Sequence, residues 1–302
     1  MNVTPEQLKH RQSLPLHLKV KETQNRIGEW YEAWDGDVYV SFSGGKDSTV
    51  LLHIARSIIP NTRGMFVDTG LEWPEVRDFV KGVDNVDWVK PKKSFHRVIE
   101  EYGYPVVSKD CSQKLTEIRT TKSYKLLHKR LCGDDKGNGK LPEKWKFLID
   151  APFKISHKCC DIMKKNPAKR YEKERGLMPI VGTMATDSSL RTSSYLRNGC
   201  NSFDTKRPRS TPMGFWTEAD VWDYIHLHNL EYADIYNSGL ERTGCMFCMF
   251  GLHMEKGENK RFDIMRQRHP KLYDYCMDKL GLREVIQYVN RGGKDHTNTA
   301  EE

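Results

Sequence analysis

The sequence Asp37-Val-Tyr-Val-Ser-Phe-Ser-Gly-Gly-Lys-Asp-Ser48 joins an apolar run to a helical pattern through a glycine-rich turn. The β-branched and aromatic residues of 37–42 are typical of a buried strand. Apolar residues then recur at the i, i+3, i+4, i+7 spacing of a helix face, at Leu51, Ile54, Ala55 and Ile58. A turn between a strand and a helix directs unpaired backbone N–H groups and the positive end of the helix dipole toward one point. The sequence therefore predicts a phosphate-binding loop at residues 43–48.

The same alternation continues along the chain. Further strands are expected at residues 65–68, 86–89 and 177–181. One helix is expected to begin near residue 74, and another to cover residues 95–102. This order predicts an α/β fold with a doubly wound parallel sheet. Ligands of such sheets bind beyond the carboxyl ends of the strands, where Asp68 ends one predicted strand and Gly182 follows another.

Three segments are expected. A helical N-terminal segment covers residues 1–36, the nucleotide-binding domain covers 37–251, and a helical C-terminal extension covers 252–302. Periodicity weakens from residue 111 to 158 into a basic, glycine-containing insertion that we expect to be a loop. It returns at Thr217, where Thr217-Glu-Ala-Asp220 is a capping box that predicts the start of a helix.

Composition narrows the classes of partner. The 302 residues contain 49 Lys and Arg against 41 Asp and Glu, a net charge of +8 that favours nucleotides or nucleic acid. No stretch reaches the roughly 20 apolar residues of a membrane span, and the N-terminus has no apolar signal-peptide core. We therefore expect a cytoplasmic protein without a membrane partner. In a reducing compartment, closely spaced cysteines are candidate metal ligands rather than disulfides.

The loop residues have distinct expected roles. Gly44 and Gly45 let the backbone approach phosphate oxygens, Lys46 adds a cation, and the hydroxyls of Ser43 and Ser48 help to orient the ligand. Asp47 is a candidate Mg²⁺ ligand. The loop is not a Walker A motif, because GxxxxGK[ST] is absent. The alternative is an ordinary strand-to-helix turn, which needs neither the lysine nor the flanking serines.

Residues 43–48 match the SGGxDS signature, so the chain resembles the PP-loop superfamily of adenine-nucleotide enzymes, with their adenine nucleotide alpha-hydrolase-like fold. Members adenylate an oxygen atom with ATP and release pyrophosphate, although one branch reduces adenylyl sulfates. Within the superfamily the chain resembles the phosphoadenosine phosphosulfate (PAPS) reductase family, through Val67-Asp-Thr-Gly70 with Pro74-Glu75, Trp216 to Tyr224, and Tyr236 to Cys245. The resemblance covers residues 37–251.

Four cysteines form the second signal. Cys159 and Cys160 are adjacent, and Cys245 and Cys248 form a CxxC. Four thiolates from two segments bind zinc or an iron–sulfur cluster, and unligated buried thiols are the third possibility. A vicinal pair with a distant CxxC resembles the [4Fe–4S] pattern of adenylyl-sulfate (APS) reductases. The lone cysteines, Cys111, Cys132, Cys200 and Cys276, are expected to be incidental thiols.

Two departures from the family pattern bear on the reaction. Assimilatory reductases carry a nucleophilic cysteine in a C-terminal Glu-Cys-Gly-(Leu/Ile)-His motif, whereas no cysteine follows Cys276 here. The family's GxRxxES segment reads Gly182-Thr-Met-Ala-Thr-Asp-Ser188, so Met184 replaces its arginine. Arg191 and Arg197 are the remaining candidates for a phosphate contact nearby, with solvated surface as the alternative.

The insertion carries a basic tract with interleaved aromatic residues, including Tyr124 and Trp145. Such a tract can follow a phosphate backbone while an aromatic ring stacks on a base, or it can be a solvated charged surface. Its cations are Lys109, Lys114, Arg119, Lys122, Lys125, Lys129, Arg130, Lys154 and Lys158.

Three functions remain open. The first is ATP-dependent adenylation and sulfur transfer to a nucleic acid, with an iron–sulfur cluster and a sulfur or electron donor protein. The second is an APS or PAPS reductase that releases sulfite, and the third is a non-catalytic nucleotide-binding subunit. In the enzymatic hypotheses Lys46, Asp47 and Asp68 are the candidate catalytic residues, and Gly182 and Arg191 join the loop in binding ATP or an adenylyl sulfate.

Overall fold

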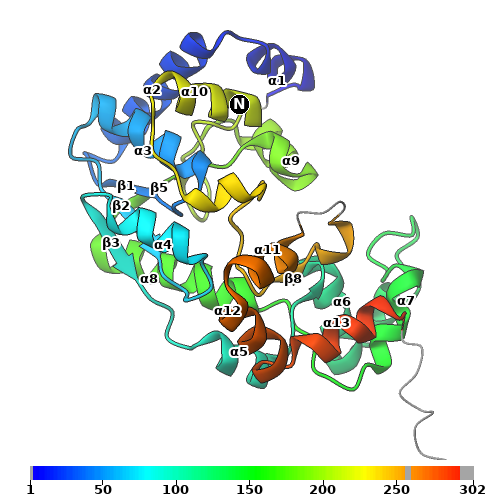
Figure 1. Ribbon diagram of the computed structural model, residues 1–302. Helices are drawn as coiled ribbons and strands as arrows, with labels where there is room; N and C mark the ends of the chain where they lie inside the picture. The colour runs from blue at the N-terminus through cyan, green and yellow to red at the C-terminus, as the bar shows by residue number, and fades with distance from the viewer. Residues whose placement is uncertain (1–2, 256–259, 293–302) are drawn as a thin grey trace, which may run out of the picture. The chain divides into compact units, whose positions relative to one another are not determined.

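The computed structural model describes residues 3–255 and 260–292, and the chain divides into two compact units (Figure 1). Unit 1 comprises Met1–Asp68, Trp73–Lys90 and Pro167–Asn237. Unit 2 comprises Thr69–Glu72, Pro91–Asn166 and Ser238–Glu302. The three segments expected from the sequence, 1–36, 37–251 and 252–302, are not the same as these compact units. That division into segments stays a prediction.

Unit 1 contains a six-stranded sheet in the order β3-β2-β1-β5-β7-β6. Its strands are β1 (Val38–Ser41), β2 (Gly64–Val67), β3 (Val86–Val89), β5 (Met178–Val181), β6 (Asn201–Ser202) and β7 (Arg209–Ser210). Neighbouring strands are parallel except for β6 and β7, so the predicted α/β fold with a parallel sheet is confirmed. The chain leaves β1 toward β2 on one side, and β5 pairs with β1 on the other. The loop after β1 therefore lies at a topological switch point, where ligands of open α/β sheets bind.

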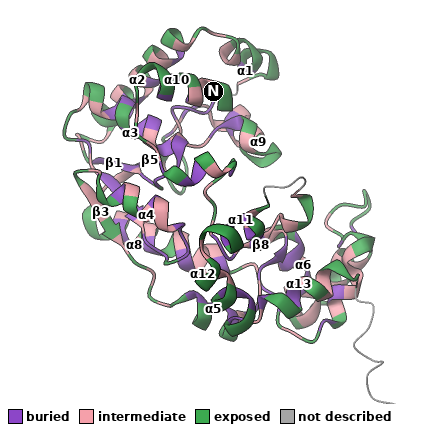
Figure 2. Cartoon of the chain, in the orientation of Figure 1, coloured by how far each residue is buried: buried purple, intermediate pink, exposed green. Residues whose placement is uncertain are grey.

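Helices cover both faces of this sheet. Tyr39 of β1 and Met65 of β2 pack with Tyr171 of α8, whereas the Phe42 ring lies 6.3 Å from the Phe79 ring of α4. Because side chains alternate along a strand, residues 39 and 42 point to opposite faces. Figure 2 shows buried residues concentrated along the central strands. The helices and short helical turns of this part of the chain are α1 (Pro5–Gln12), α2 (Leu16–Ala33), α3 (Lys46–Ile58), α4 (Pro74–Lys81), α8 (Asn166–Arg175), η3 (Ala185–Asp187), α9 (Ser189–Asn198), α10 (Glu218–Leu227) and η4 (Asp234–Ser238).

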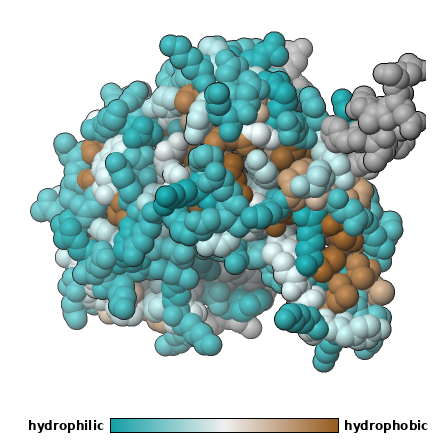
Figure 3. Space-filling view, turned by 90° about the horizontal axis from the view of Figure 1, so that it is seen from below, coloured by the Kyte–Doolittle hydropathy of each residue, from teal (hydrophilic) through white to brown (hydrophobic). Residues whose placement is uncertain are grey.

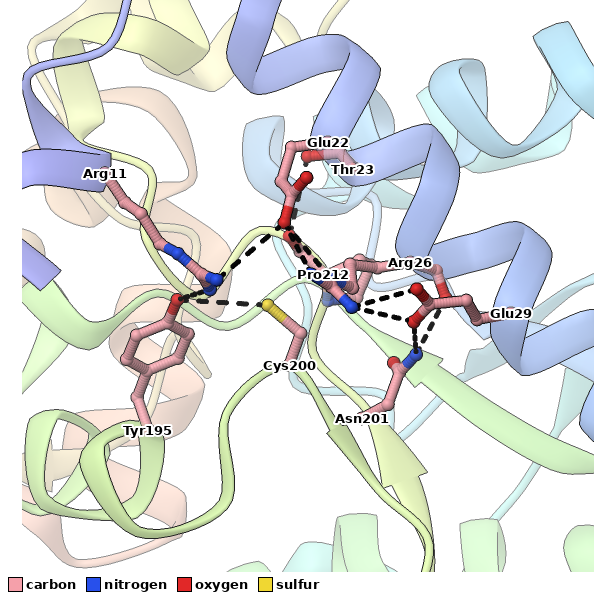
Figure 4. Close-up of polar contacts among 9 residues, drawn as sticks. All are labelled: Arg11, Glu22, Thr23, Arg26, Glu29, Tyr195, Cys200, Asn201 and Pro212. Atoms are coloured by element: carbon pink, nitrogen blue, oxygen red, sulfur yellow. Dashed lines mark hydrogen bonds and ion pairs between the residues drawn. The ribbon is translucent and has the colours of Figure 1, made fainter. Parts of the chain in front are cut away.

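The N-terminal segment, expected to be helical, forms two helices, α1 and α2. Pro15 precedes the first residue of α2, and proline has no N–H with which to continue α1. Polar contacts attach both helices to the rest of unit 1 (Figure 4). Arg11 donates to the Tyr195 hydroxyl at 3.0 Å, and Asn201 donates to the backbone carbonyl of Arg26 at 2.9 Å.

Unit 2 is mainly helical, with one parallel pair of short strands, β4 (Val106–Val107) and β8 (Met249–Phe250). The expectation of a loop over 111–158 is wrong, because helices α6 and α7 occupy much of it. Serine caps start both helices, at Ser108 and Ser123, and α7 buries none of its residues, which leaves no apolar periodicity to read. The remaining helices and helical turns are α5 (Phe95–Tyr102), α6 (Lys109–Thr120), α7 (Tyr124–Leu131), η1 (Glu143–Asp150), η2 (Asp161–Lys165), η5 (Leu252–Met254), α11 (Arg261–Arg268), α12 (Pro270–Asp274), η6 (Tyr275–Lys279) and α13 (Leu282–Asn290).

The helices of the described residues include none that is long and apolar enough to span a membrane. The face of the molecule in Figure 3 is largely hydrophilic, with apolar residues gathered in a few patches.

Candidate functional site

The loop after β1 is packed too closely for any residue but glycine at position 44. Gly44 has φ +70°, a conformation that side chains disfavour. A Cβ atom there would lie 2.6 Å from Val80 Cγ2 and 2.8 Å from Val76 Cγ1, both on α4. The glycine thus brings the loop backbone against α4 and fixes the position from which α3 begins.

Two serine hydroxyls hold the loop in a closed turn. The backbone N–H of Ser43 donates to Ser48 Oγ at 3.1 Å, and the two Oγ atoms lie 3.0 Å apart. Ser48 Oγ in turn donates to the carbonyl of Gly45 at 2.9 Å. Helix α3 starts at Lys46 with Gly45 as its N-cap, and no side chain caps it. The N-terminus of α3 therefore has the geometry that favours an anion.

Lys46 has a buried side chain and two carboxylate partners. Its Nζ atom lies 3.0 Å from Glu218 and 3.5 Å from Asp47. The Tyr236 hydroxyl accepts the backbone N–H of Lys46 at 3.0 Å, and the Tyr236 ring centroid lies 5.6 Å from Nζ. Burial alone would lower the pKa of Lys46, but the Asp47 charge and the Glu218 hydrogen bond outweigh it and raise the pKa. The lysine is thus a permanent cation beside the loop.

Asp47 is the acidic member of the loop. Burial raises the pKa of Asp47; Lys46 opposes this shift, while the carboxylates of Asp187 and Glu218 add to it. Its Oδ1 atom is buried and has no hydrogen-bond partner within the part of the chain that the structure describes. The same Oδ1 atom forms an ion pair with Lys46 Nζ at 3.5 Å. A carboxylate oxygen that has no hydrogen bond and lies near two other carboxylates has the donor chemistry that suits Mg²⁺.

The other predicted nucleotide contacts have partners within unit 1. Asp68 is buried at the end of β2, with Arg77 Nη2 3.0 Å from its carboxylate. A Cβ atom on Gly182 would lie 3.2 Å from the Asp47 carbonyl, so Gly182 lets β5 approach the start of α3. Arg191 forms an ion pair with Asp187, four residues earlier. Gly182 thus joins the loop directly, whereas Asp68 and Arg191 already carry counterions.

Met184, at the position of the family's arginine, is buried in unit 1. Its backbone N–H donates to the Asp187 carboxylate at 3.0 Å. Glu218, Tyr236 and Asp187 were not predicted as site residues. Glu218 is the second residue of the Thr217 capping box, and Tyr236 lies in a segment that resembles the family. The sequence therefore drew attention to both segments, but it did not indicate that either side chain contacts the loop.

The four candidate metal ligands all belong to unit 2. Cys159 and Cys160 precede η2, and Cys245 and Cys248 precede β8. Burial, followed by the charges of the other three cysteines, raises the pKa of Cys159. Burial followed by Cys245 raises the pKa of Cys248 to about 11. The charges of the two cysteine pairs therefore act on one another within unit 2.

Basic residues border this cysteine group. Burial alone would lower the pKa of Lys164, but the Cys245 thiol and the Glu72 carboxylate outweigh it and raise the pKa. Glu72 accepts hydrogen bonds from Thr69, from the backbone N–H at 2.9 Å and from the hydroxyl at 2.8 Å. Arg261 donates to the carbonyl of Cys248 at 2.5 Å. Cations near thiols favour their thiolate forms.

Among residues 3–255 and 260–292, no three His, Cys, Asp or Glu side chains are already arranged to hold a metal ion. The cysteine group fits a cluster by donor chemistry, since it offers four sulfur atoms and adjacent cations that offset the negative charge of a thiolate-bound cluster. The thiols are grouped without forming a coordination shell.

Three of the four lone cysteines are buried and have no reactive environment. Cys276 is fully buried in η6, and burial raises its pKa to about 12. Burial likewise raises the pKa of Cys111 to about 12 and that of Cys200 to about 11. Cys132 is exposed. A thiol with such a high pKa is protonated at neutral pH and is a poor nucleophile.

Comparison with known proteins gives relatives for most of the chain. It is 26% identical over 267 residues to an uncharacterized protein of Methanocaldococcus jannaschii, covering 86% of this chain and 52% of the relative. A second uncharacterized protein of that organism is 25% identical over 280 residues, and 47% of its length is covered. The chain thus spans about half the length of these two relatives. An adenosine 5′-phosphosulfate reductase of Staphylococcus epidermidis is 25% identical over 228 residues, with 74% of each chain covered.

Among solved structures, a PAPS reductase from Candida auris in a phosphate complex matches with a TM-score of 0.44 and 18% identity, covering 81% of this chain and 97% of that one. An FMN adenylyltransferase from Candida glabrata matches with a TM-score of 0.46 and 12% identity, covering 85% and 77%. The sequence profile of the phosphoadenosine phosphosulfate reductase domain matches residues 37–131 and 119–250. Since the two profile matches together span well over half of the residues, the chain belongs to the phosphoadenosine phosphosulfate reductase domain family.

Proposed function

We propose that this chain binds an adenine nucleotide at residues 43–48 and uses it to adenylate an acceptor, into which sulfur is then inserted. The proposal rests on the loop, where Gly44, the two serine hydroxyls and the N-terminus of α3 form an anion site next to the buried Lys46 ammonium group. A turn with only a structural role needs no lysine at this position, whereas Lys46 is buried and stays charged because two carboxylates pair with it.

The reaction balances as two displacements. An acceptor oxygen attacks the α-phosphorus of ATP, and the bond to the bridging oxygen breaks to release pyrophosphate. Hydrosulfide from a donor then displaces AMP; if the donor is a persulfide, a second thiol of the donor breaks the resulting S–S bond and forms a disulfide within the donor. Lys46 would neutralise the departing phosphates, and Asp47 would hold Mg²⁺ through Oδ1, which makes no hydrogen bond among the described residues. The net charge of +8 supports a nucleic-acid acceptor.

The cysteine group enters the proposal as the site of an iron–sulfur cluster. Cys159, Cys160, Cys245 and Cys248 would hold it. The cluster, when bound, would supply the sulfur for the second step. Lys164 would offset the negative charge of the thiolates.

A sulfonucleotide reductase is the second candidate, favoured by the APS reductase among the relatives. In that reaction a thiolate attacks the sulfur of the sulfonucleotide, the bond from sulfur to the phosphate oxygen breaks, and a second thiol releases sulfite from the thiosulfonate. Cys276 is the nearest match by position to the family's nucleophile. Its full burial and its raised pKa disfavour that role.

One experiment separates the candidates. Protein purified without oxygen is incubated with ATP and nucleic acid, and separately with APS or PAPS and a thiol, and pyrophosphate and sulfite are measured. We expect pyrophosphate from wild type and its loss in Lys46→Ala, with nucleotide affinity about 10- to 150-fold weaker because a charge-assisted hydrogen bond is worth about 1.5–3 kcal/mol. The control is Lys169→Ala, at an exposed lysine of α8. Sulfite release without ATP cleavage would establish the reductase instead.

A further inference from the structure

The positive charge of the chain is concentrated in one part of unit 2. Residues 109–158 contain thirteen Lys and Arg but only six Asp and Glu, a net charge of +7 within a chain of net charge +8. The rest of the chain is therefore close to neutral. Such a local excess marks a surface for an anionic partner only where its cations are exposed and unpaired.

Several of these cations are engaged within the fold. The Arg119 guanidinium donates to four backbone carbonyls between Leu148 and Phe153, at 2.6–2.9 Å. Three others form ion pairs of 2.5–2.9 Å, namely Lys109 with Asp161, Lys114 with Asp110 and Arg130 with Glu117. The basic tract of the sequence is thus partly structural, and Arg119 in particular attaches η1 to α6.

Four lysines remain on and beside α7. They are exposed, and none of them has an ion pair within the described ranges; they are Lys122, Lys125, Lys136 and Lys140. The loop after α7 folds back on the helix, because Leu141 N–H donates to the Arg130 carbonyl at 2.7 Å and Arg130 Nη1 donates to the Gly139 carbonyl at 3.1 Å. Residues 122–140, here called the α7 lobe, therefore form one local structure (Figure 1).

An exposed aromatic ring stands between Lys122 and Lys125 in the sequence. Tyr124, the first residue of α7, has 80% of its surface exposed. The centroid of its ring lies 6.1 Å from that of His128, one turn along the helix. Exposing a tyrosine gives up the free energy of burying its ring, and a ring in that position can stack on a flat partner.

We infer that the α7 lobe binds single-stranded nucleic acid, with the four lysines at backbone phosphates and Tyr124 stacked on a base. The inference rests on the proposed function in taking nucleic acid as the acceptor. An acidic protein would match the lysines but would leave Tyr124 without a planar partner. A duplex keeps its bases stacked on one another, so the ring could not reach a base face.

Fluorescence anisotropy of the full chain with labelled 20-nucleotide DNA and RNA single strands, and with a duplex, tests the inference. We expect the variant with Lys122, Lys125, Lys136 and Lys140 all changed to Gln to bind single strands at least about 100-fold more weakly at 0.1 M salt. The slope of log affinity against log salt should also fall by about 3, because each phosphate contact on a single strand contributes about 0.7.

A matched control keeps the net charge equal. Changing Lys9, Lys21, Lys169 and Lys173 to Gln removes four exposed lysines of unit 1. This variant should bind within about threefold of wild type if the effect is local. Tyr124→Ala should weaken single-strand binding at least about fivefold with an unchanged salt slope, whereas Tyr124→Phe should retain it, since stacking needs the ring and not the hydroxyl.

Three outcomes would overturn the inference. The first is an equal loss of affinity in both quadruple variants, and the second is equal affinity for duplex and single strands with no effect of Tyr124→Ala. The third is binding that heparin, a polyanion without bases, competes away while Tyr124→Ala has no effect. DNA and RNA share a phosphate backbone, so comparing the affinities for the two single strands shows which nucleic acid the α7 lobe prefers. Binding through the α7 lobe without pyrophosphate release would refute the proposed adenylation and leave this inference standing.

Discussion

The Nζ atom of Lys46, after β1, lies 3.0 Å from the carboxylate of Glu218, in the first turn of α10. The lysine side chain is 4% exposed and the glutamate side chain 49% exposed, so a buried cation is paired with a hydrated anion. An incoming phosphate would therefore compete with Glu218 for the same ammonium group. Glu218 keeps Lys46 charged and oriented until a ligand takes its place.

Removing this competitor should strengthen nucleotide binding. Glu218→Gln is expected to tighten ATP binding about two- to fivefold, because partly exposed ion pairs are worth about 0.2–1 kcal/mol. Isothermal titration calorimetry measures the change. Glu231→Gln removes an exposed carboxylate of the same unit and serves as the control. Unchanged or weaker ATP binding in Glu218→Gln would show that phosphate does not displace Glu218.

Gly44→Ala should destabilise unit 1 through strain and overlap together. The left-handed backbone costs about 1–2 kcal/mol for a non-glycine residue, and the overlap with Val76 and Val80 adds about 1–3 kcal/mol. Gly176→Ala is the matched control, since Gly176 has φ +71° with no atom within 4 Å of an added Cβ. Urea unfolding should show a larger loss for Gly44→Ala, and equal losses would mean that the packing against α4 is not tight.

The buried ion pair between Lys19 and Asp220 joins α2 to α10. Lys19 is 2% exposed, and its Nζ atom donates to both Asp220 oxygens at 2.6–2.7 Å. Asp220→Ala should lower the free energy of unfolding by about 3–5 kcal/mol, because it leaves a buried cation without its partner. Asp223→Ala, at an exposed position of α10, should change it by less than about 0.5 kcal/mol. A loss below about 1 kcal/mol in Asp220→Ala would mean that water reaches Lys19.

Cys276 should behave as a core residue. With a pKa raised to about 12 by burial, its thiol stays protonated and unreactive at pH 8, while exposed Cys132 is accessible. Brief iodoacetamide treatment of the folded protein, followed by mass spectrometry, should modify Cys132 and spare Cys276. Cys276→Ser should lower stability without abolishing pyrophosphate release from ATP. Rapid alkylation of Cys276 would reopen its candidacy as a nucleophile.

The sequence predicted the sheet because its strands are short apolar runs separated by turn signals. The strands at 86–89 and 178–181 and the helix at 95–102 lie within a residue of their predicted bounds. Helices α6 and α7 were missed for a physical reason. α6 is stabilised partly by Arg119 donating to distant carbonyls, and α7 has no buried face. Neither feature produces a hydrophobic period.

The candidate site was predictable where its chemistry is local in sequence. Residues 43–48 carry their own signature, and the two cysteine pairs carry theirs. Glu218 and Tyr236 approach Lys46 only because α10 and η4 fold back beside α3, and no spacing rule encodes a contact across 170 or more residues. The counterion of Arg191, by contrast, is Asp187, four residues earlier, and the i, i+4 spacing could have predicted this ion pair.

The pairing of β1 with β5 has a consequence for how the polypeptide matures during synthesis. Val38 is in register with Met178, so the central strand must wait for its neighbour until most of the chain has left the ribosome. Residues 91–166, which belong to unit 2, emerge in the interval. Contacts of such long sequence separation slow folding and prolong the exposure of unpaired strand edges. A nascent chain halted before residue 178 would therefore present β1 as an open edge, a target for chaperones that the finished protein no longer offers.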